Sequence, residues 1–327
     1  MHINIWFADL LRLLYNENTL NGLLAKKLLP NLQQVFIQKI ESALTINKAV
    51  ELHVLRLDEI HPVVSGNKLF KLHYYINEAK INPGSQVITY GGAYSNHLAA
   101  TAYTCHNLGI PTTGIVRGQR PGTLSHTLQY CHQMGMDLKF ISREAYTQQN
   151  DEEAIAAIHR AYNNAIIIPE GGYSSTGAAG AEKITSYINE KYTHICCACG
   201  TATTIAGILM GAAKQQVIAV PVLKGITDIE KRIIHLTNNK SLLQQLHIAG
   251  DYHFGGYAKY NGQLLQFMNQ LYNAYKLPTD FVYTGKLMYA VFKLIENDFF
   301  TPGSNIIAIH TGGLQGNLSL APGSLTF

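Results

Sequence analysis

Short apolar runs of strand length alternate with stretches of helix length from about residue 50 to the C-terminal part of the chain. This alternation is typical of α/β proteins, because two parallel strands need a crossover segment, usually a helix, between them. The predicted strands are 52–57, 86–90, 112–117, 136–141, 165–169, 194–199, 217–222 and 305–310. The predicted helices are 67–80, 95–108, 123–134, 151–163, 177–190 and 203–214. The pattern therefore predicts an α/β fold with open, twisted, mostly parallel sheets.

Several of the predicted strands end in glycine-rich turns. These turns contain Gly91-Gly92, Gly171-Gly172, Gly200 and Gly312-Gly313. Open parallel sheets bind ligands beyond the carboxyl ends of their strands, and glycine lets the backbone approach a ligand closely. The glycines therefore mark one side of the molecule as the candidate site.

The composition limits the class of protein. The 327 residues are 47% hydrophobic and 14% charged, which is enough apolar material for about two domains. A net charge of +4 without a block of Lys and Arg argues against nucleic acid as a partner. Five cysteines and no recognisable secretory signal favour a reducing compartment, so we expect the protein in the cytoplasm.

Residues 1–45 are interpreted as an N-terminal helical extension that covers part of the main body or a subunit interface. The stretch 3–14 is apolar, but it carries Asp9 and Arg12 and is too short and too charged to span a bilayer. We therefore expect no membrane partner.

The basic stretch from Ser65 to Lys71 follows a strand-like run and opens a predicted helix. Lys68 and Lys71 are three residues apart, so both amines lie on one face of that helix. Each cation then disfavours protonation of the other and favours a nucleophilic, neutral amine at Lys68. A solvated lysine pair is the alternative, and this stretch alone does not exclude it.

A turn of small residues, Gly200-Thr201-Ala202-Thr203-Thr204, lies between a predicted buried strand and a predicted helix. Backbone amides at a helix N-terminus, with threonine hydroxyls beside them, can bind a phosphate. The turn has neither the lysine of a P-loop nor the glycine spacing of a dinucleotide fold, so a smaller phosphorylated cofactor fits it better. The alternative is tight packing of the strand against the helix.

Four further residues could face a ligand. Ser95 and Asn96 follow a glycine turn and could donate to a ligand oxygen, or one of them could simply cap the helix. Tyr257 and Tyr283 stand near glycines, which suits a phenol that stacks on a ring or transfers a proton. With 19 tyrosines in the chain, an interface or core role for either stays open.

The cysteine run 196–199 is not expected to bind a metal. It lies within a predicted strand, where Cys197 points away from its two neighbours, and no second Cys or His pair at ligand spacing accompanies it. These cysteines are therefore interpreted as small core residues.

Five motifs occur together in one order along the chain. They are Gly66-Asn67-Lys68 with Lys71, Ser95-Asn96-His97, Gly200 to Gly207, Tyr283-Thr284-Gly285-Lys286 and His310-Thr311-Gly312-Gly313. In this order they resemble the 1-aminocyclopropane-1-carboxylate deaminase and D-cysteine desulfhydrase family of pyridoxal-phosphate enzymes of fold type II. The resemblance implies a tryptophan synthase β-like fold with a larger cofactor-binding domain, 1–71 plus 184–327, and a smaller inserted domain, 72–183.

The resemblance also implies how the cofactor, pyridoxal 5′-phosphate, is held. Lys68 would form the Schiff base with the cofactor aldehyde, Asn67 would lie against the pyridine ring, and Lys71 would be a second lysine near the cofactor. Asn96 would bond the phenolic oxygen of the ring, and Thr284 would face the pyridine nitrogen. The phosphate would be held by Gly200, Thr201, Ala202, Thr203 and Thr204.

The resemblance also implies that three residues contact the substrate or transfer its protons. Ser95 would contact the substrate carboxylate or take part in proton transfer, and Tyr257 and Tyr283 correspond to the two active-site tyrosines of the family. A hydroxyl at Thr284, where the deaminases favour glutamate, tilts the expectation toward elimination from a small D-amino acid. Phe70, Tyr94 and Ser65 differ from the residues usual in the family, which leaves the substrate open.

The implied activity is that of a lyase, deaminase or hydrolase acting on a small amino acid and giving a 2-oxo acid and ammonia. Racemisation or dehydration of a small amino acid, and cofactor binding without catalysis, are the alternatives. The family is commonly dimeric, so a homodimer is expected.

Overall fold

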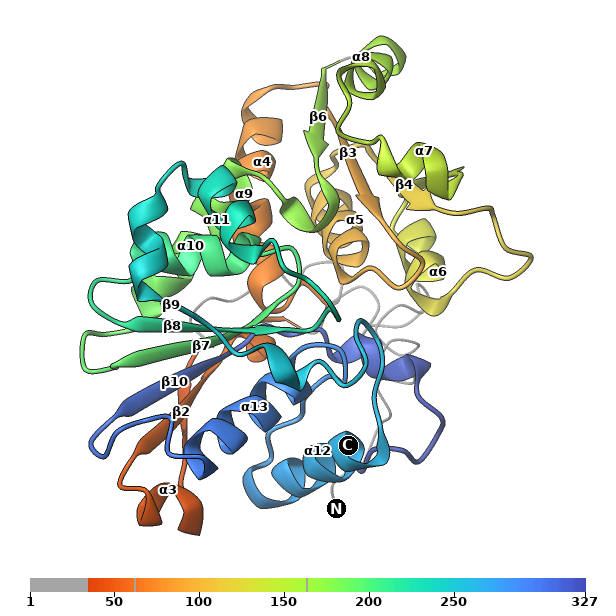
Figure 1. The fold of residues 1–327 in the computed structure, drawn as a ribbon. Coiled ribbons are helices and arrows are strands. Elements are labelled where there is room, and N and C mark those ends of the chain that lie inside the picture. Colours follow the sequence, from red (N-terminus) through yellow and green to blue (C-terminus); the bar gives the residue numbers. More distant parts are fainter. Residues whose placement is uncertain (1–34, 62, 163) are drawn as a thin grey trace.

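The computed structural model describes residues 35–61, 63–162 and 164–327, and it contains two sheets in different parts of the molecule (Figure 1). The larger sheet has the order β1-β2-β10-β7-β8-β9, and the smaller has the order β5-β4-β3-β6. Strand pairs are parallel in both sheets except at the edge strand β1, which is antiparallel to β2. This is the mostly parallel α/β architecture that the sequence predicts.

The strands of the larger sheet are β1 (Ile37–Ile40), β2 (Glu51–Arg56), β7 (His194–Cys199), β8 (Gln216–Pro221), β9 (Leu246–Ile248) and β10 (Asn305–His310). Those of the smaller sheet are β3 (Gln86–Gly91), β4 (Thr112–Arg117), β5 (Asp137–Ile141) and β6 (Ala165–Ile168). The α-helices are α3 (Ala43–Asn47), α4 (Asn67–Ile81), α5 (Asn96–Leu108), α6 (His126–Gln133), α7 (Arg143–Thr147), α8 (Glu152–Ala161), α9 (Ser175–Glu182), α10 (Thr203–Gly211), α11 (Ile229–Thr237), α12 (Gly262–Tyr275) and α13 (Thr284–Glu296).

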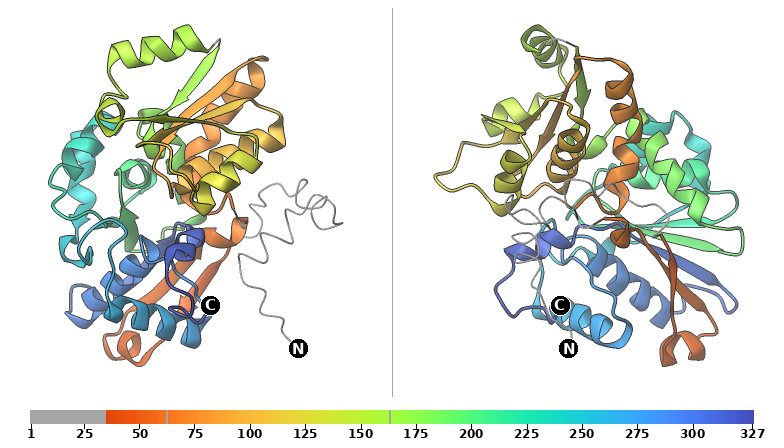
Figure 2. Two further views of the ribbon diagram at one scale, coloured as in Figure 1. Left: turned by 90° about the vertical axis from the view of Figure 1, so that its right-hand side faces the viewer. Right: turned by 180° about the vertical axis from the view of Figure 1, so that it is seen from behind.

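Helices cover both faces of the larger sheet, and the alternation of strand side chains explains why. Successive residues of a strand point to opposite faces. Leu55 and Cys197 pack with α10 and α11, whereas their neighbours Val54 and Cys196 pack with α13. The opposite orientation predicted for Cys197 is confirmed. Figure 2 shows the smaller sheet with α5 to α8 at one end of the molecule and α12 and α13 at the other.

All eight predicted strands are present, each within one residue of its predicted ends. The short strands β1 and β9 were not predicted, and neither were α7, α11, α12 and α13. The predicted helix 177–190 is shorter than expected, since α9 ends at Glu182 and a 3-10 helix, Lys183–Tyr187, follows. Of the predicted N-terminal extension, 1–34 lies outside the described residues.

Helix α4 links the two cores. Phe70, near its start, packs in the core of the larger sheet, whereas Leu72 and Tyr75 pack in the core of the smaller one. Ala178 and Ala181 of α9 also lie in the core of the larger sheet. The change from one core to the other falls within α4, and the domain limits 1–71 plus 184–327 and 72–183 remain a prediction.

Candidate active site

A cavity lies at the carboxyl ends of the strands of the larger sheet. It is lined by the start of α4, the turn between β7 and α10, the segment after β10 and the start of α13, with Asn96 and Gly171 from the side of the smaller sheet. The position is the one that the glycine turns predict for an open parallel sheet. Gly171, Gly200, Gly312 and Gly313 all line it.

The turn before α4 requires glycine at position 66. Gly66 has a φ of +69°, and a Cβ built there would lie 1.9 Å from the carbonyl oxygen of Thr311. Only glycine combines this backbone conformation with so close an approach. The contact places the start of α4, which carries the lysines, directly against the segment that follows β10.

Lys68, Asn67 and Thr204 form a chain of hydrogen bonds at the cavity wall. The Lys68 ammonium donates to Asn67 Oδ1 over 2.7 Å, and Asn67 Nδ2 donates to Thr204 Oγ1 over 2.7 Å. Asn67 is buried, so its bonds are shielded from water. The asparagine thereby connects the candidate reactive lysine to the glycine and threonine turn.

Both lysines titrate at unusually low pH. Burial lowers the pKa of Lys68 to about 8, and the negative charge of Asp280 opposes this shift. Burial also lowers the pKa of Lys71 to about 7, and the charge of Lys68 adds to the shift as the second cause. The sequence led us to expect low pKa values from repulsion between the two amines. That expectation is corrected, because loss of hydration is the larger cause of the low pKa of both lysines. Lys71 Nζ also donates to the carbonyl of Gly171 over 3.0 Å.

The turn from Gly200 to Thr204 has the geometry of an anion site. Ala202 precedes α10 in a left-handed conformation, with a φ of +69°. The amide of Ala206 bonds to the carbonyl of Ala202, and the amides that precede it in the first turn have no carbonyl partner within the helix. Gly200, Thr201, Ala202 and Thr204 line the cavity. Thr203 is buried and does not line it, and its hydroxyl lies 2.9 Å from that of Thr201.

Of the pair Ser95 and Asn96, only Asn96 lines the cavity. Ser95 is the N-cap of α5, and its hydroxyl accepts from the amide of Leu98 over 3.2 Å. Asn96 Oδ1 is buried without a hydrogen-bond partner among the described residues. His97 is a packed histidine, in contact with Thr89 Oγ1 over 3.0 Å, and burial lowers its pKa to about 3. An orphaned amide group therefore remains available to a ligand.

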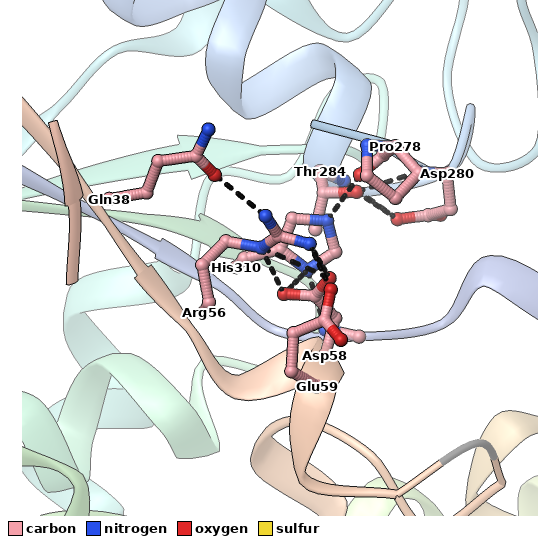
Figure 3. A network of polar contacts seen from close by, with 9 residues as sticks. Gln38, Arg56, Asp58, Glu59, Pro278, Asp280, Thr284 and His310 are labelled. Atoms are coloured by element: carbon pink, nitrogen blue, oxygen red, sulfur yellow. Dashed lines mark hydrogen bonds and ion pairs between the residues drawn. The ribbon is translucent and has the colours of Figure 1, made fainter. Parts of the chain in front are cut away.

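The start of α13 is organised by the carboxylate of Asp280, for which the sequence reasoning had no role. Its Oδ2 accepts from the amide of Tyr283. Its Oδ1 accepts from both the amide and the hydroxyl of Thr284, and Figure 3 shows these two residues side by side. Thr284 is fully buried and is absent from the cavity lining. The hydroxyl of Thr284 thus donates to Asp280. The contact of Thr284 with the pyridine nitrogen, which the family resemblance implies, remains a prediction.

The two candidate tyrosines lie side by side, and one of them is in the wall of the cavity. Tyr283 lines it, and the Lys68 Nζ stands 5.9 Å from the centre of its ring. The ring of Tyr257 lies edge-on, 6.1 Å from the ring of Tyr283, and is 47% exposed. Burial raises the pKa of both phenols, so each is a neutral hydroxyl at neutral pH.

Two cavity residues, Thr311 and Gln315, had no individual role in the sequence reasoning. Thr311 lies in the motif His310-Thr311-Gly312-Gly313, which the sequence analysis named. Its place in that motif was the signal that could have identified it as a cavity residue. Gln315 follows the Gly312-Gly313 turn and carries no such signal.

Two findings concern other classes of site. Within the described ranges, no group of three or more His, Cys, Asp or Glu side chains could hold a metal ion. No helix in the same part of the chain is both long and apolar enough to cross a bilayer.

The fold and the cavity with its buried lysine are those of a cofactor-dependent α/β enzyme, and comparison with known proteins gives the family. Residues 40–312 match the model of the pyridoxal-phosphate dependent enzyme family. The chain belongs to this family, so it is an enzyme that uses pyridoxal phosphate.

Named relatives and one solved structure narrow the comparison. The chain is 30% identical over 300 residues to a bifunctional D-cysteine desulfhydrase/1-aminocyclopropane-1-carboxylate deaminase of Arabidopsis thaliana, covering 81% of this chain and 73% of that protein. It is 27% identical to a D-cysteine desulfhydrase of Salmonella typhi, covering 80% and 87%. The crystal structure of an ACC deaminase homologue has a TM-score of 0.73 at 24% identity and covers 97% of both chains. The expected family, fold class and lyase or deaminase chemistry are confirmed, and the label of hydrolase is not supported.

The residues at the site fit the cofactor. The unpartnered Oδ1 of Asn96 leaves this side-chain amide available to a polar group of the cofactor, and the amides at the start of α10 suit the phosphate. A Cβ at Gly313 would lie 2.9 Å from Asn96 Nδ2, so glycine keeps this part of the cavity open. The negative charge of a phosphate would also offset the positive charge gathered at Lys68 and Lys71.

Proposed function

We propose that the chain catalyses β-elimination from a small D-amino acid, as a D-cysteine desulfhydrase does. D-Cysteine and water would give pyruvate, ammonia and hydrogen sulfide. The observation that carries the proposal is the partly buried Lys68, whose Nζ lies at the cavity between Asn67 and Tyr283. Bound pyridoxal phosphate supplies the electron sink for chemistry at the α-carbon, and the protein supplies position and electrostatics.

Residues of the chain would transfer the protons, bind the phosphate and orient the ring. Lys68, with its pKa near 8, can take a proton from the substrate α-carbon and return it near neutral pH. Lys71 and the amides of α10 would hold the phosphate, and Asn96 would orient the ring. Tyr283, a neutral phenol, would give a proton to the departing sulfur.

The cavity lining favours elimination over ring opening of 1-aminocyclopropane-1-carboxylate. Among the described residues that line it there is no aspartate or glutamate. A pyridine nitrogen that meets a hydroxyl, as the family resemblance implies for Thr284, would stay largely unprotonated, and this would limit electron withdrawal. The proposed site therefore suits a substrate with a good leaving group at its β-carbon.

The experiment is an activity panel with the purified protein loaded with pyridoxal phosphate. D-Cysteine, L-cysteine, D-serine and 1-aminocyclopropane-1-carboxylate are each assayed for 2-oxo acid, sulfide and the inverted enantiomer. Sulfide and pyruvate released in equal amounts from D-cysteine support the proposal. Inversion without 2-oxo acid would establish a racemase instead, and binding of the cofactor without turnover of any substrate would establish a silent binding protein.

We also propose a homodimer in the cytoplasm. All five cysteines are free and buried, as in a reducing compartment. Sedimentation equilibrium of the full chain tests the dimer, and fractionation of cells of the source organism tests the location.

A further inference from the structure

Lys286 has no role in the proposed chemistry, yet it is a fully buried lysine one helical turn beyond Tyr283. Its Nζ donates to the carbonyl of His253 over 2.9 Å and to that of Gly256 over 2.7 Å. Burial lowers the pKa of Lys286 to about 8, against the opposing charge of Asp280. Burying an amine is costly, so a buried lysine whose partners are two loop carbonyls is a poor choice for stability alone.

The loop that accepts these bonds has an irregular backbone. Phe254, Gly255, Gly256 and Ala258 have φ values of +52°, +92°, +117° and +53°. Left-handed residues in such a series cannot form a helix or a strand, so the loop depends on individual hydrogen bonds for its shape. The amides of Gly256 and Lys259 supply two bonds to the same two carbonyls, and Lys286 supplies the bonds that connect the loop to α13.

This loop carries Tyr257. Gly256, whose carbonyl Lys286 holds, is its immediate neighbour in the chain. The Tyr257 ring reaches the ring of Tyr283, which lines the cavity. Both tyrosines are thus held at the N-terminal end of α13: Asp280, just before the helix, accepts from the amide of Tyr283, and Lys286, in its first turn, bonds the carbonyl next to Tyr257.

We propose that Lys286 is a positioning residue, which fixes the turn from His253 to Gly256 so that the phenol of Tyr257 stands beside Tyr283 of the cavity wall. The inference rests on the proposed function, in which this cavity receives the substrate. Lys286 acts only through the loop and touches neither substrate nor cofactor.

The test replaces the ammonium by an apolar group of similar length, Lys286→Met. Hydrogen exchange of the protein, with and without bound pyridoxal phosphate, is followed by mass spectrometry in peptides that cover 250–260. We expect exchange in this loop to rise at least about tenfold while exchange in α13 stays unchanged, because the bonds between loop and helix are lost. Lys293→Met is the matched control, since Lys293 is exposed on the same helix.

The second readout is a double-mutant cycle on the rate of 2-oxo acid formation. If Lys286 acts through Tyr257, then Lys286→Met lowers kcat about tenfold in the normal background and less than about twofold in the Tyr257→Phe background. An equal loss in both backgrounds, or unchanged exchange in the loop, would overturn the inference.

A shorter variant guards against misfolding. Lys286→Gln keeps an NH2 donor without the charge, and we expect loop exchange and kcat between those of Lys286→Met and the unaltered protein. A glutamine variant no better than methionine in either readout contradicts the inference. The exchange experiment needs no turnover, so it judges Lys286 even if the panel of amino acids shows that the proposed reaction is wrong.

Discussion

The Lys68 ammonium and the side-chain oxygen of Asn67 lie 2.7 Å apart, and the same asparagine donates to Thr204 at the start of α10. One amide therefore sets the direction of the lysine relative to the turn proposed for the phosphate. A cofactor bound both at Lys68 and at the turn that contains Thr204 would therefore have a fixed orientation relative to the amine of Lys68.

Replacement of Lys68 tests the attachment point. Lys68→Ala should lower turnover by at least about 10³-fold, because it removes the amine proposed to form the Schiff base. Borohydride reduction followed by peptide mapping should find the cofactor on Lys68 in the unaltered protein. Lys80→Ala, at an exposed position of the same helix, is the control. An adduct on Lys71 in the unaltered protein would refute the assignment.

Removal of the Asn67 amide should weaken cofactor binding. Asn67→Ala deletes two hydrogen bonds in a buried place, and each is worth about 1 kcal/mol, so the Kd should rise roughly tenfold or more. Absorbance titration of the protein stripped of cofactor measures the Kd. Asn77→Ala, on the exposed side of α4, should leave it unchanged. Equal affinities of Asn67→Ala and Asn77→Ala for pyridoxal phosphate would show that the Asn67 amide does not contribute to cofactor binding.

Loading of the cofactor should depend on pH through the amine of Lys68. Burial lowers the pKa of Lys68 to about 8. The neutral form attacks an aldehyde, so the loading rate should rise about tenfold per pH unit below pH 8 and level off above it. Stopped-flow absorbance at a series of pH values gives the midpoint. A rate that still rises steeply between pH 9 and pH 10.5 would show an ordinary, hydrated lysine.

Substitution of Thr284 distinguishes two placements of its side chain. The hydroxyl of Thr284 lies 2.7 Å from Asp280 Oδ1 and is fully buried. Thr284→Glu would set a second carboxylate beside the first, and it should reduce the free energy of unfolding by about 3 kcal/mol. Urea denaturation measures this, with Thr284→Ser as the variant that keeps the hydroxyl. If Thr284→Glu is as stable as the unaltered protein and gains activity on the cyclopropane substrate, residue 284 faces the cofactor as the family resemblance implies.

Gly66 offers a purely steric prediction. A Cβ there meets the Thr311 carbonyl at 1.9 Å, whereas a Cβ at Gly84, also at positive φ, meets nothing within 4 Å. Gly66→Ala should therefore cost about 3 kcal/mol more than Gly84→Ala, because only the first combines a strained φ with overlap. Parallel urea melts give the difference. Equal losses would mean that the start of α4 can move away from the segment after β10.

The strands and the lysine could be predicted from sequence because both rest on local patterns. Apolar runs such as 194–199, which is buried from Ile195 onward, can be recognised as strands without knowledge of a distant partner. Lys68 could be found because five short motifs each sit at the start of a helix or the end of a strand. By contrast, β1 owes its place to pairing with β2, and such an edge strand has little signal of its own.

The finer contacts of the site depend on side chains that the sequence does not place together. Ser95 could be a ligand or a cap, and only the hydrogen bond from Leu98 shows that it is a cap. Asp280 lies four residues before Thr284, yet nothing in that spacing predicts that one carboxylate accepts four hydrogen bonds from the turn. Such networks depend on the assembled backbone rather than on residue type.

The passage of α4 from one core to the other has a mechanical consequence. Its first turn is fixed to the larger sheet through Phe70, while Leu72 and Tyr75 belong to the smaller sheet. A swing of the smaller sheet about this helix would carry Asn96 and Gly171 toward or away from the cavity and leave the amine of Lys68 near the pivot. The reactive group would then keep its place while the walls around it open to admit substrate.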